Sequence, residues 1–143
     1  MSIDEERLTA LARHFRIAIE QTKKHKLPSW FMDFPRGCCG DTADLLGVYL
    51  EDLGMQDVRH VWAMHGEVSH AWIEVNGIVV DITSDQFPEF TDSVVVADPS
   101  RWHENLTDRK CREVDRSNVS CNLAPALRAI EESINILRPF ELP

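Results

Sequence analysis

The chain lacks a long apolar run and is poor in basic residues. Its 143 residues include 15 lysines and arginines against 24 aspartates and glutamates, which gives a formal net charge of −9. A chain this acidic repels phosphate groups, so we expect no nucleic-acid partner. No apolar stretch approaches the length that crosses a bilayer, and no basic start leads into an apolar run as in a signal peptide. We therefore expect no membrane association and a cytoplasmic location.

Cysteine is also scarce, and its spacing excludes common metal sites. The four cysteines and six histidines include no Cys-x-x-Cys and no His-x-x-x-His pair. Those spacings let one turn or one helix supply two ligands, so we expect no metal and no cofactor. Cysteines without a disulfide framework suit a reducing compartment, and we interpret Cys111 and Cys121 as structural thiols.

Composition predicts one globular domain over residues 1–143. Hydrophobic residues make up 43% of the chain and charged residues 27%, and no repeat or low-complexity linker divides it. Nothing in the pattern indicates an oligomeric state.

Apolar periodicity predicts helices at both ends of the chain and strands between them. Residues 3–25 should form an amphipathic helix, with Ser2 as its cap, acidic residues in its first turn and three lysines at its end (Lys23, Lys24, Lys26). A second helix should start near Cys39 and stop at Gly54, and the last should span 125–137, with its core positions at Ala126, Ile130, Ile134 and Leu137. We expect strands at 58–64, 69–75 and 78–83, with 94–97 a candidate fourth, and assign no element to 99–122. Helices around an antiparallel meander make an α+β fold.

Asn76-Gly77 predicts a tight hairpin between the second and third of these strands. Its type I′ turn opposes Val75 to Ile78 and Ile73 to Val80. His70 and Asp81 are then diagonal neighbours on one face, within side-chain hydrogen-bonding reach. The other face is wholly apolar (Ala71, Ile73, Val75, Ile78, Val80, Ile82).

Because that face is wholly apolar, it suffices to supply the core contacts of the two strands. We therefore expect His70, Trp72 and Asp81 to line a cleft. A surface ion pair between His70 and Asp81 is the alternative interpretation.

A pair of adjacent cysteines opens the second predicted helix. A cysteine at a helix start meets unpaired backbone N–H groups and the positive end of the helix dipole, which favour a thiolate and can hold an oxyanion. Periodicity does not choose between Cys38 and Cys39, and either thiol could instead be a buried small hydrophobic group. A thiol, an imidazole and a carboxylate are the parts of a cysteine nucleophile, its base and the group that orients the base.

Three motifs resemble the transglutaminase-like branch of the papain-like cysteine enzymes. They are Gly37-x-Cys39-x-Asp41, His70-Ala71-Trp72 and Val80-Asp81-Ile82-Thr83. The resemblance implies a papain-like core, in which the cysteine-bearing helix packs on an antiparallel sheet, and it places the nucleophile at Cys39. The chain looks more like the small bacterial members, which include peptide-maturation proteases and glutamine deamidases.

One element of the papain-like pattern is missing. Papain-like proteases hold the oxyanion partly with a glutamine shortly before the cysteine, and residues 30–33 contain none. Trp30, Trp62 and Gln86 are the candidates for that second donor. Trp72, Trp30 and Gln86 are our candidates for substrate binding.

The site predicts a cysteine-dependent acyl-transfer enzyme that acts on an amide bond of a peptide or protein. Cys39 would form a thioester, His70 would move the proton and Asp81 would orient His70. Peptide cleavage, glutamine deamidation and amine transfer all remain open, because cleft shape selects the acceptor. A noncatalytic binding module of the same fold, or a toxin-type effector with the same chemistry, are the alternatives.

Overall fold

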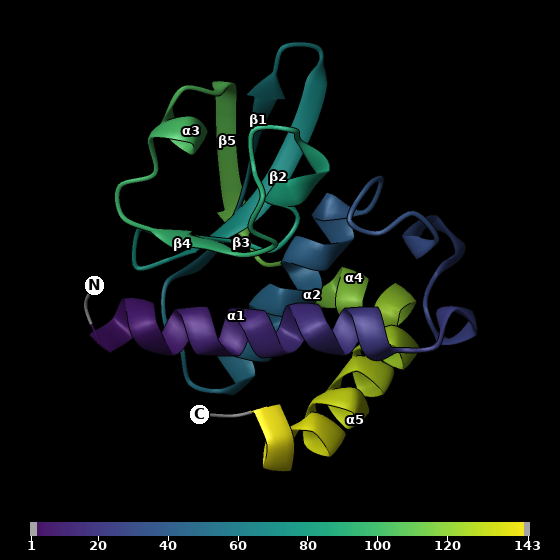
Figure 1. Ribbon diagram of the computed structural model, residues 1–143. Coiled ribbons are helices and arrows are strands. Elements are labelled where there is room, and N and C mark those ends of the chain that lie inside the picture. Colours follow the sequence, from purple (N-terminus) through teal and green to yellow (C-terminus); the bar gives the residue numbers. More distant parts are fainter. Residues whose placement is uncertain (1–2, 142–143) are drawn as a thin grey trace.

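A five-stranded antiparallel sheet forms the centre of the computed structural model, which describes residues 3–141 (Figure 1). The strand order is β4-β3-β2-β1-β5. The strands are β1 (Val58–His65), β2 (Val68–Val75), β3 (Ile78–Asp81), β4 (Val95–Ala97) and β5 (Thr107–Glu113). The first four strands form the expected meander, and β5 returns to pair with β1 at the opposite edge.

Three long helices pack beside this sheet. They are α1 (Ile3–Gln21), α2 (Cys39–Asp52) and α5 (Ala124–Glu141). α1 lies against β3 and β4, α2 lies against β1 and β2, and α5 packs on α1. The short α3 (Arg101–Glu104) lies away from these helices, beyond β4 in the view of Figure 1. The expected α+β architecture, with the cysteine-bearing helix on an antiparallel sheet, is confirmed.

The hairpin that carries His70 and Asp81 forms in the predicted register. Asn76 and Gly77 have φ values of 50° and 81°, and a type I′ turn requires positive φ at both positions. Ile73 pairs with Val80, and Val75 with Ile78. β3 ends two residues earlier than predicted, because the backbone N–H of Thr83 turns back to donate to the Asp81 carboxylate.

Both faces of the hairpin are covered. The predicted apolar face joins the main core beneath the helices, through Ile73, Val75, Ile78, Val80 and Ile82. The opposite face contributes to a second, smaller apolar cluster formed by Val61, Ala63, Trp72 and Val79. This second cluster is what the sequence pattern did not predict.

The first helix is shorter than predicted. α1 ends at Gln21, so the three lysines predicted for its last turn lie beyond it. The Thr22 hydroxyl donates to the Ala18 carbonyl, a local bond that competes with helix continuation. The acidic first turn is confirmed, with Asp4, Glu5 and Glu6 in place. Ser2, the predicted cap, lies outside the described residues.

The polar region 99–122, to which we assigned no element, contains a strand and several short helices. β5 was missed because nearly all of its residues are exposed and polar, as suits a charged edge strand that lacks an apolar face. α4 (Arg116–Asn118) and the single π-helical turn η4 (Val119–Leu123) then lead directly into α5. Within α5, Ala126, Ile130 and Ile134 are buried as predicted.

Three 3-10 turns complete the fold: η1 (Lys24–Lys26), η2 (Ser29–Phe31) and η3 (Ser84–Gln86). The helices among residues 3–141 include none with both the length and the apolar character needed to cross a bilayer.

Candidate active site

The two adjacent cysteines at the start of α2 have different surroundings. Cys38 is the N-cap and is buried at 3% exposure, and this burial raises the pKa of its thiol to about 11. Cys39 is the first helical residue and is partly exposed. Its thiol lies near enough to the His70 imidazole to help raise the pKa of that ring. Of the two thiols, Cys39 is therefore the one placed beside the imidazole and within reach of a substrate.

His70 and Asp81 form a buried hydrogen-bonded pair. His70 Nε2 lies 2.6 Å from Asp81 Oδ2, and both side chains are almost fully buried. Burial opposes the charged form of His70, but the Asp81 carboxylate outweighs it and the Cys39 thiol adds to the effect, so the pKa of His70 rises to about 9. The diagonal contact predicted from the hairpin register is confirmed.

The Asp81 carboxylate is ionised and held by hydrogen bonds at both oxygens. Burial alone would raise its pKa, but the charge of His70 and the hydrogen bonds from His103 and His70 lower it far below its usual range. Oδ1 accepts the backbone N–H of Thr83 at 2.9 Å and lies 3.4 Å from its hydroxyl. Because Nε2 of His70 is bound to Oδ2, Nδ1 is the ring nitrogen that remains for other partners.

His103 is a member of the site that the sequence pattern did not reveal. Its Nε2 lies 2.7 Å from Asp81 Oδ2, the same oxygen that His70 binds, and its Nδ1 lies 2.6 Å from the Ser100 hydroxyl. The side chain is buried at 2% exposure, although it comes from a short helix in a polar region. A histidine three residues after a serine is too common a pattern to have identified it.

The imidazole is covered and does not line an open cleft, which corrects our expectation. His70, Trp72 and Asp81 are each at most 1% exposed. The chain after β3 folds back over them, so that Phe87 meets the His70 ring edge-on at 5.0 Å and Trp102 lies 5.8 Å from it. The second face of the hairpin therefore faces an aromatic layer.

The three predicted substrate-binding residues occupy different places. Trp72 stacks on His70 with ring centroids 5.6 Å apart, but it is buried and presents no surface to a substrate. Trp30 is 51% exposed, and its indole N–H donates to Asp41 in the first turn of α2 at 2.8 Å. Gln86 is partly buried, and its amide nitrogen lies 3.2 Å from His70 Nδ1 and 3.0 Å from the Thr83 carbonyl oxygen.

These contacts bear on the missing oxyanion donor. The single N–H of Trp30 is occupied by Asp41, and Trp62 lies beside His60, with ring centroids 5.8 Å apart. Gln86 is the candidate with an N–H directed at the His70 imidazole, while it also donates to the Thr83 carbonyl. Its N–H donates to Nδ1 only while that nitrogen is unprotonated.

His70, Asp81 and His103 carry atom types that ligate metals, and these atoms lie within 4.8 Å of one another. The Nε2 atoms of His70 and His103 are hydrogen-bonded to the same oxygen, Asp81 Oδ2, at 2.6 and 2.7 Å. Such short contacts leave no room for an ion between them, so we treat the cluster as a hydrogen-bonded group.

A second buried histidine–aspartate pair joins β1 to α2. His60 Nδ1 lies 3.0 Å from Asp44 Oδ1, and the Arg112 guanidinium grips both Asp44 oxygens at 3.1 Å. Burial opposes ionisation of Asp44, but the hydrogen bonds from His60, Arg112 and the backbone of Asp115 lower its pKa to about 2.

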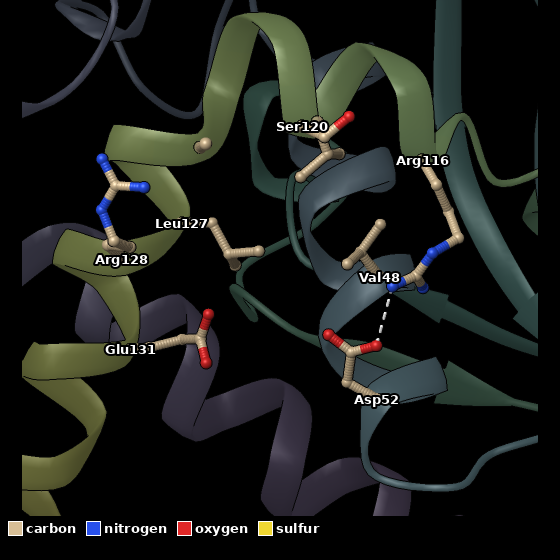
Figure 2. A pocket seen from close by; sticks show the side chains of 9 residues that line it. Val48, Asp52, Arg116, Ser120, Leu127, Arg128 and Glu131 are labelled. Atoms are coloured by element: carbon tan, nitrogen blue, oxygen red, sulfur yellow. Dashed lines mark hydrogen bonds and ion pairs between the residues drawn. The ribbon is translucent and has the colours of Figure 1, made fainter.

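A separate cavity of about 250 Å³ lies between α2, η4 and α5 (Figure 2). Its floor is apolar, and its rim is charged, with Arg116 paired to Asp52 at 2.9 Å. None of the predicted site residues lines it.

Comparisons with family models, with curated proteins and with solved structures found no match to this chain. The function is therefore argued from the geometry of the site, and the resemblance of its three motifs stays a prediction.

Proposed function

We propose that this protein is a cysteine-dependent acyl-transfer enzyme that acts on an amide bond through a thioester. The nucleophile is Cys39, the proton carrier is His70 and the orienting carboxylate is Asp81. The observation that carries the proposal is the placement of a partly exposed thiol at a helix start, near an imidazole whose pKa it helps to raise and which is hydrogen-bonded to a buried carboxylate.

In the resting state the imidazole holds a proton at neutral pH, because its pKa is raised to about 9. Asp81 accepts the Nε2 proton, so the second proton sits on Nδ1, facing the sulfur. An imidazolium beside a sulfur attracts a thiolate, and the backbone N–H groups at the start of α2 add to that attraction. Protonation of Nδ1 also releases the Gln86 N–H from its bond to this nitrogen.

In the first chemical step the Cys39 sulfur attacks the carbonyl carbon of the substrate amide. A carbon–sulfur bond forms, and the carbonyl electron pair moves to the oxygen. The N–H groups of the first turn of α2 have no helical carbonyl partner and can bind that oxyanion. The Gln86 N–H released from His70 is a suitable second donor.

The tetrahedral intermediate then expels the amine. The carbon–nitrogen bond breaks, and the proton on Nδ1 passes to the leaving nitrogen, which leaves a thioester and a neutral imidazole. Water or a second amine attacks the thioester, Nδ1 accepts its proton, and the sulfur departs as thiolate. Asp81 keeps the Nε2 proton in place throughout, so the correct ring nitrogen faces the reaction.

We further propose a peptide or protein substrate and a papain-like, transglutaminase-like core. The exposed indole of Trp30, fixed to the same helix turn as Cys39, offers a side chain of the substrate an apolar surface. Water as acceptor makes the enzyme a peptidase or a glutamine deamidase, and an amine makes it a transglutaminase.

The test is mass spectrometry of a panel of glutamine-containing peptides incubated with the enzyme and a small primary amine. We expect one of three changes: peptide fragments, the mass gain of an amide converted to an acid, or incorporation of the amine. Cys39→Ala should abolish the change, whereas Cys38→Ala should retain it, because Cys38 is buried. A chelator should leave it unaffected.

The proposal is wrong if Cys38→Ala abolishes the change and Cys39→Ala does not, or if a chelator removes an activity that Cys39→Ala retains. Melting curves of both variants keep loss of fold separate from loss of chemistry.

A further inference from the structure

His103 meets the site from a side that the proposed triad does not use. It reaches Asp81 from α3, on the segment that folds over the hairpin. Its ring packs at 4.7 Å from Trp72 and 4.9 Å from Trp102, and it is 2% exposed. A substrate at Cys39 cannot touch a side chain buried on the far side of Asp81, so any role of His103 must act through that carboxylate.

The hydrogen bonds of His103 determine its tautomer. A neutral imidazole that faced the carboxylate with a lone pair would repel it, so Nε2 must carry the hydrogen and donate to Asp81 Oδ2. Nδ1 is then an acceptor, and the Ser100 hydroxyl donates to it at 2.6 Å. Ser100 thus fixes the second donor of Asp81 in the orientation that the carboxylate needs.

We infer that His103 is a positioning residue: it donates a second hydrogen bond to the Asp81 oxygen that binds His70, which moderates the pull of the carboxylate on that imidazole. The effect of His103 on catalysis rests on the proposed function. The coupling of His70 and His103 through one carboxylate oxygen does not depend on that function.

The expected effect follows from the other bonds to Asp81. Loss of the His103 donor leaves Asp81 in place, because Thr83 still holds Oδ1 at 2.9 Å. Oδ2 then accepts one hydrogen bond fewer, so its negative charge stabilises the protonated form of His70 more strongly. The His70 pKa should therefore move above its present value of about 9.

The groups that titrate near His70 are few. Asp81 from β3 and Cys39 from α2 act on it directly, and His103 acts on it through Asp81. The ion pair of His65 and Glu89 lies at the outer edge of Phe87 and Trp102, rings that contact both His65 and His70.

The experiment is an NMR titration of the His70 imidazole in the 143-residue chain, with the resonance assigned by its loss in His70→Gln. His103→Leu fills the space without a donor and should raise the His70 titration midpoint by about half a pH unit or more. His103→Gln places its amide nitrogen where Nε2 lies and should restore the midpoint. His103→Asn places its amide nitrogen at the Nδ1 position instead and should behave like His103→Leu.

His60→Leu is the matched control, since it breaks the other buried histidine–aspartate pair. An unchanged midpoint in His103→Leu and His103→Asn, or an equal shift in His60→Leu, would overturn the inference. If His103→Leu does not fold, the difference between His103→Gln and His103→Asn decides. The titration needs no substrate, so the two proposals are tested separately. The His70 midpoint can stay unchanged although Cys39 turns over substrate, and it can shift although no turnover is found.

Discussion

In the described part of the chain two buried aspartates pair with histidine, Asp44 with His60 and Asp81 with both His70 and His103, and it is His70 that lies near a thiol. Asp44 pairs with His60 and is also gripped by the Arg112 guanidinium, which is always charged. Asp81 pairs with His70 and shares its remaining bonds between a second imidazole and Thr83. A permanent cation fixes the charge of the first pair, whereas the second is built from groups that can gain and lose protons. The same two residue types thus serve structure in one place and are suited to chemistry in the other.

Asp81→Asn should separate the two pairs most strongly. The amide keeps the shape of the carboxylate but favours the wrong tautomer of His70, so we expect turnover to fall on the order of 10³-fold. Asp44→Asn, the same change in the other pair, should leave the turnover of folded protein within about twofold, since Asp44 does not contact the proposed triad. Initial rates per folded molecule measure both. Equal losses in the two variants would contradict the distinction.

Asp44→Ala should have the largest effect on stability. It leaves the buried His60 without its partner and Arg112, whose side chain is 38% exposed, without its counter-ion, and leaving a buried donor unsatisfied costs about 1–3 kcal/mol of unfolding free energy. Urea unfolding, followed by circular dichroism, measures the loss. Asp44→Ala combined with Arg112→Met should recover part of it, because the uncompensated cation is then removed too. If the double variant is no more stable than Asp44→Ala, the unpaired Arg112 guanidinium is not the cause of the lost stability.

Thiol reactivity gives a smaller but direct contrast. At pH 6 we expect iodoacetamide to label Cys39 on the order of 100-fold faster than Cys111 or Cys121, although those two are exposed. Cys38 should react slowest, because it is buried and its pKa is about 11. Peptide mapping after brief labelling reads all four sites. His70→Gln should remove the advantage of Cys39 and His60→Gln should keep it, and preferential labelling of Cys38 would move the nucleophile there.

The pH dependence of stability should differ in sign between the two pairs. Asp44 has a lowered pKa, so its stabilisation is present above about 3.8 and is lost as pH falls through about 2, which is worth about 2 kcal/mol. His70 has a raised pKa, so its stabilisation is complete below 6.5 and is lost as pH rises through about 9.

Urea unfolding across pH tests this with one variant of each pair. The stability difference between the native protein and His70→Gln should narrow between pH 6.5 and 9. The difference from Asp44→Asn should narrow only in acid. The reverse pattern would contradict the raised pKa of His70 and the lowered pKa of Asp44.

The sequence predicted the elements whose pattern is set locally. Alternation and the Asn76-Gly77 turn fixed the hairpin register, and with it the contact of His70 and Asp81. Apolar periodicity and the Gly54 stop predicted the helix that starts at Cys39. Each of these depends on neighbours within a few residues of one another.

What the sequence did not reveal depends on distant parts of the chain. β5 has no apolar face, because it is an exposed edge that needs only a partner strand. His103 and the aromatic cover were missed for a related reason, since nothing in residues 82–104 states which face of the hairpin they will cover. The expectation of an open cleft failed at that point.

The complete burial of His70 has a consequence for how protons move. Its ring is 0% exposed, while Cys39 is partly exposed. Solvent therefore cannot reach Nε2 of His70. Phe87 and Trp102 cover the protons that His70 and His103 donate to Asp81. These protons should exchange slowly with deuterated water and appear as separate downfield resonances. Any proton that enters or leaves the imidazole during a reaction should therefore do so at Nδ1, the nitrogen that Gln86 contacts.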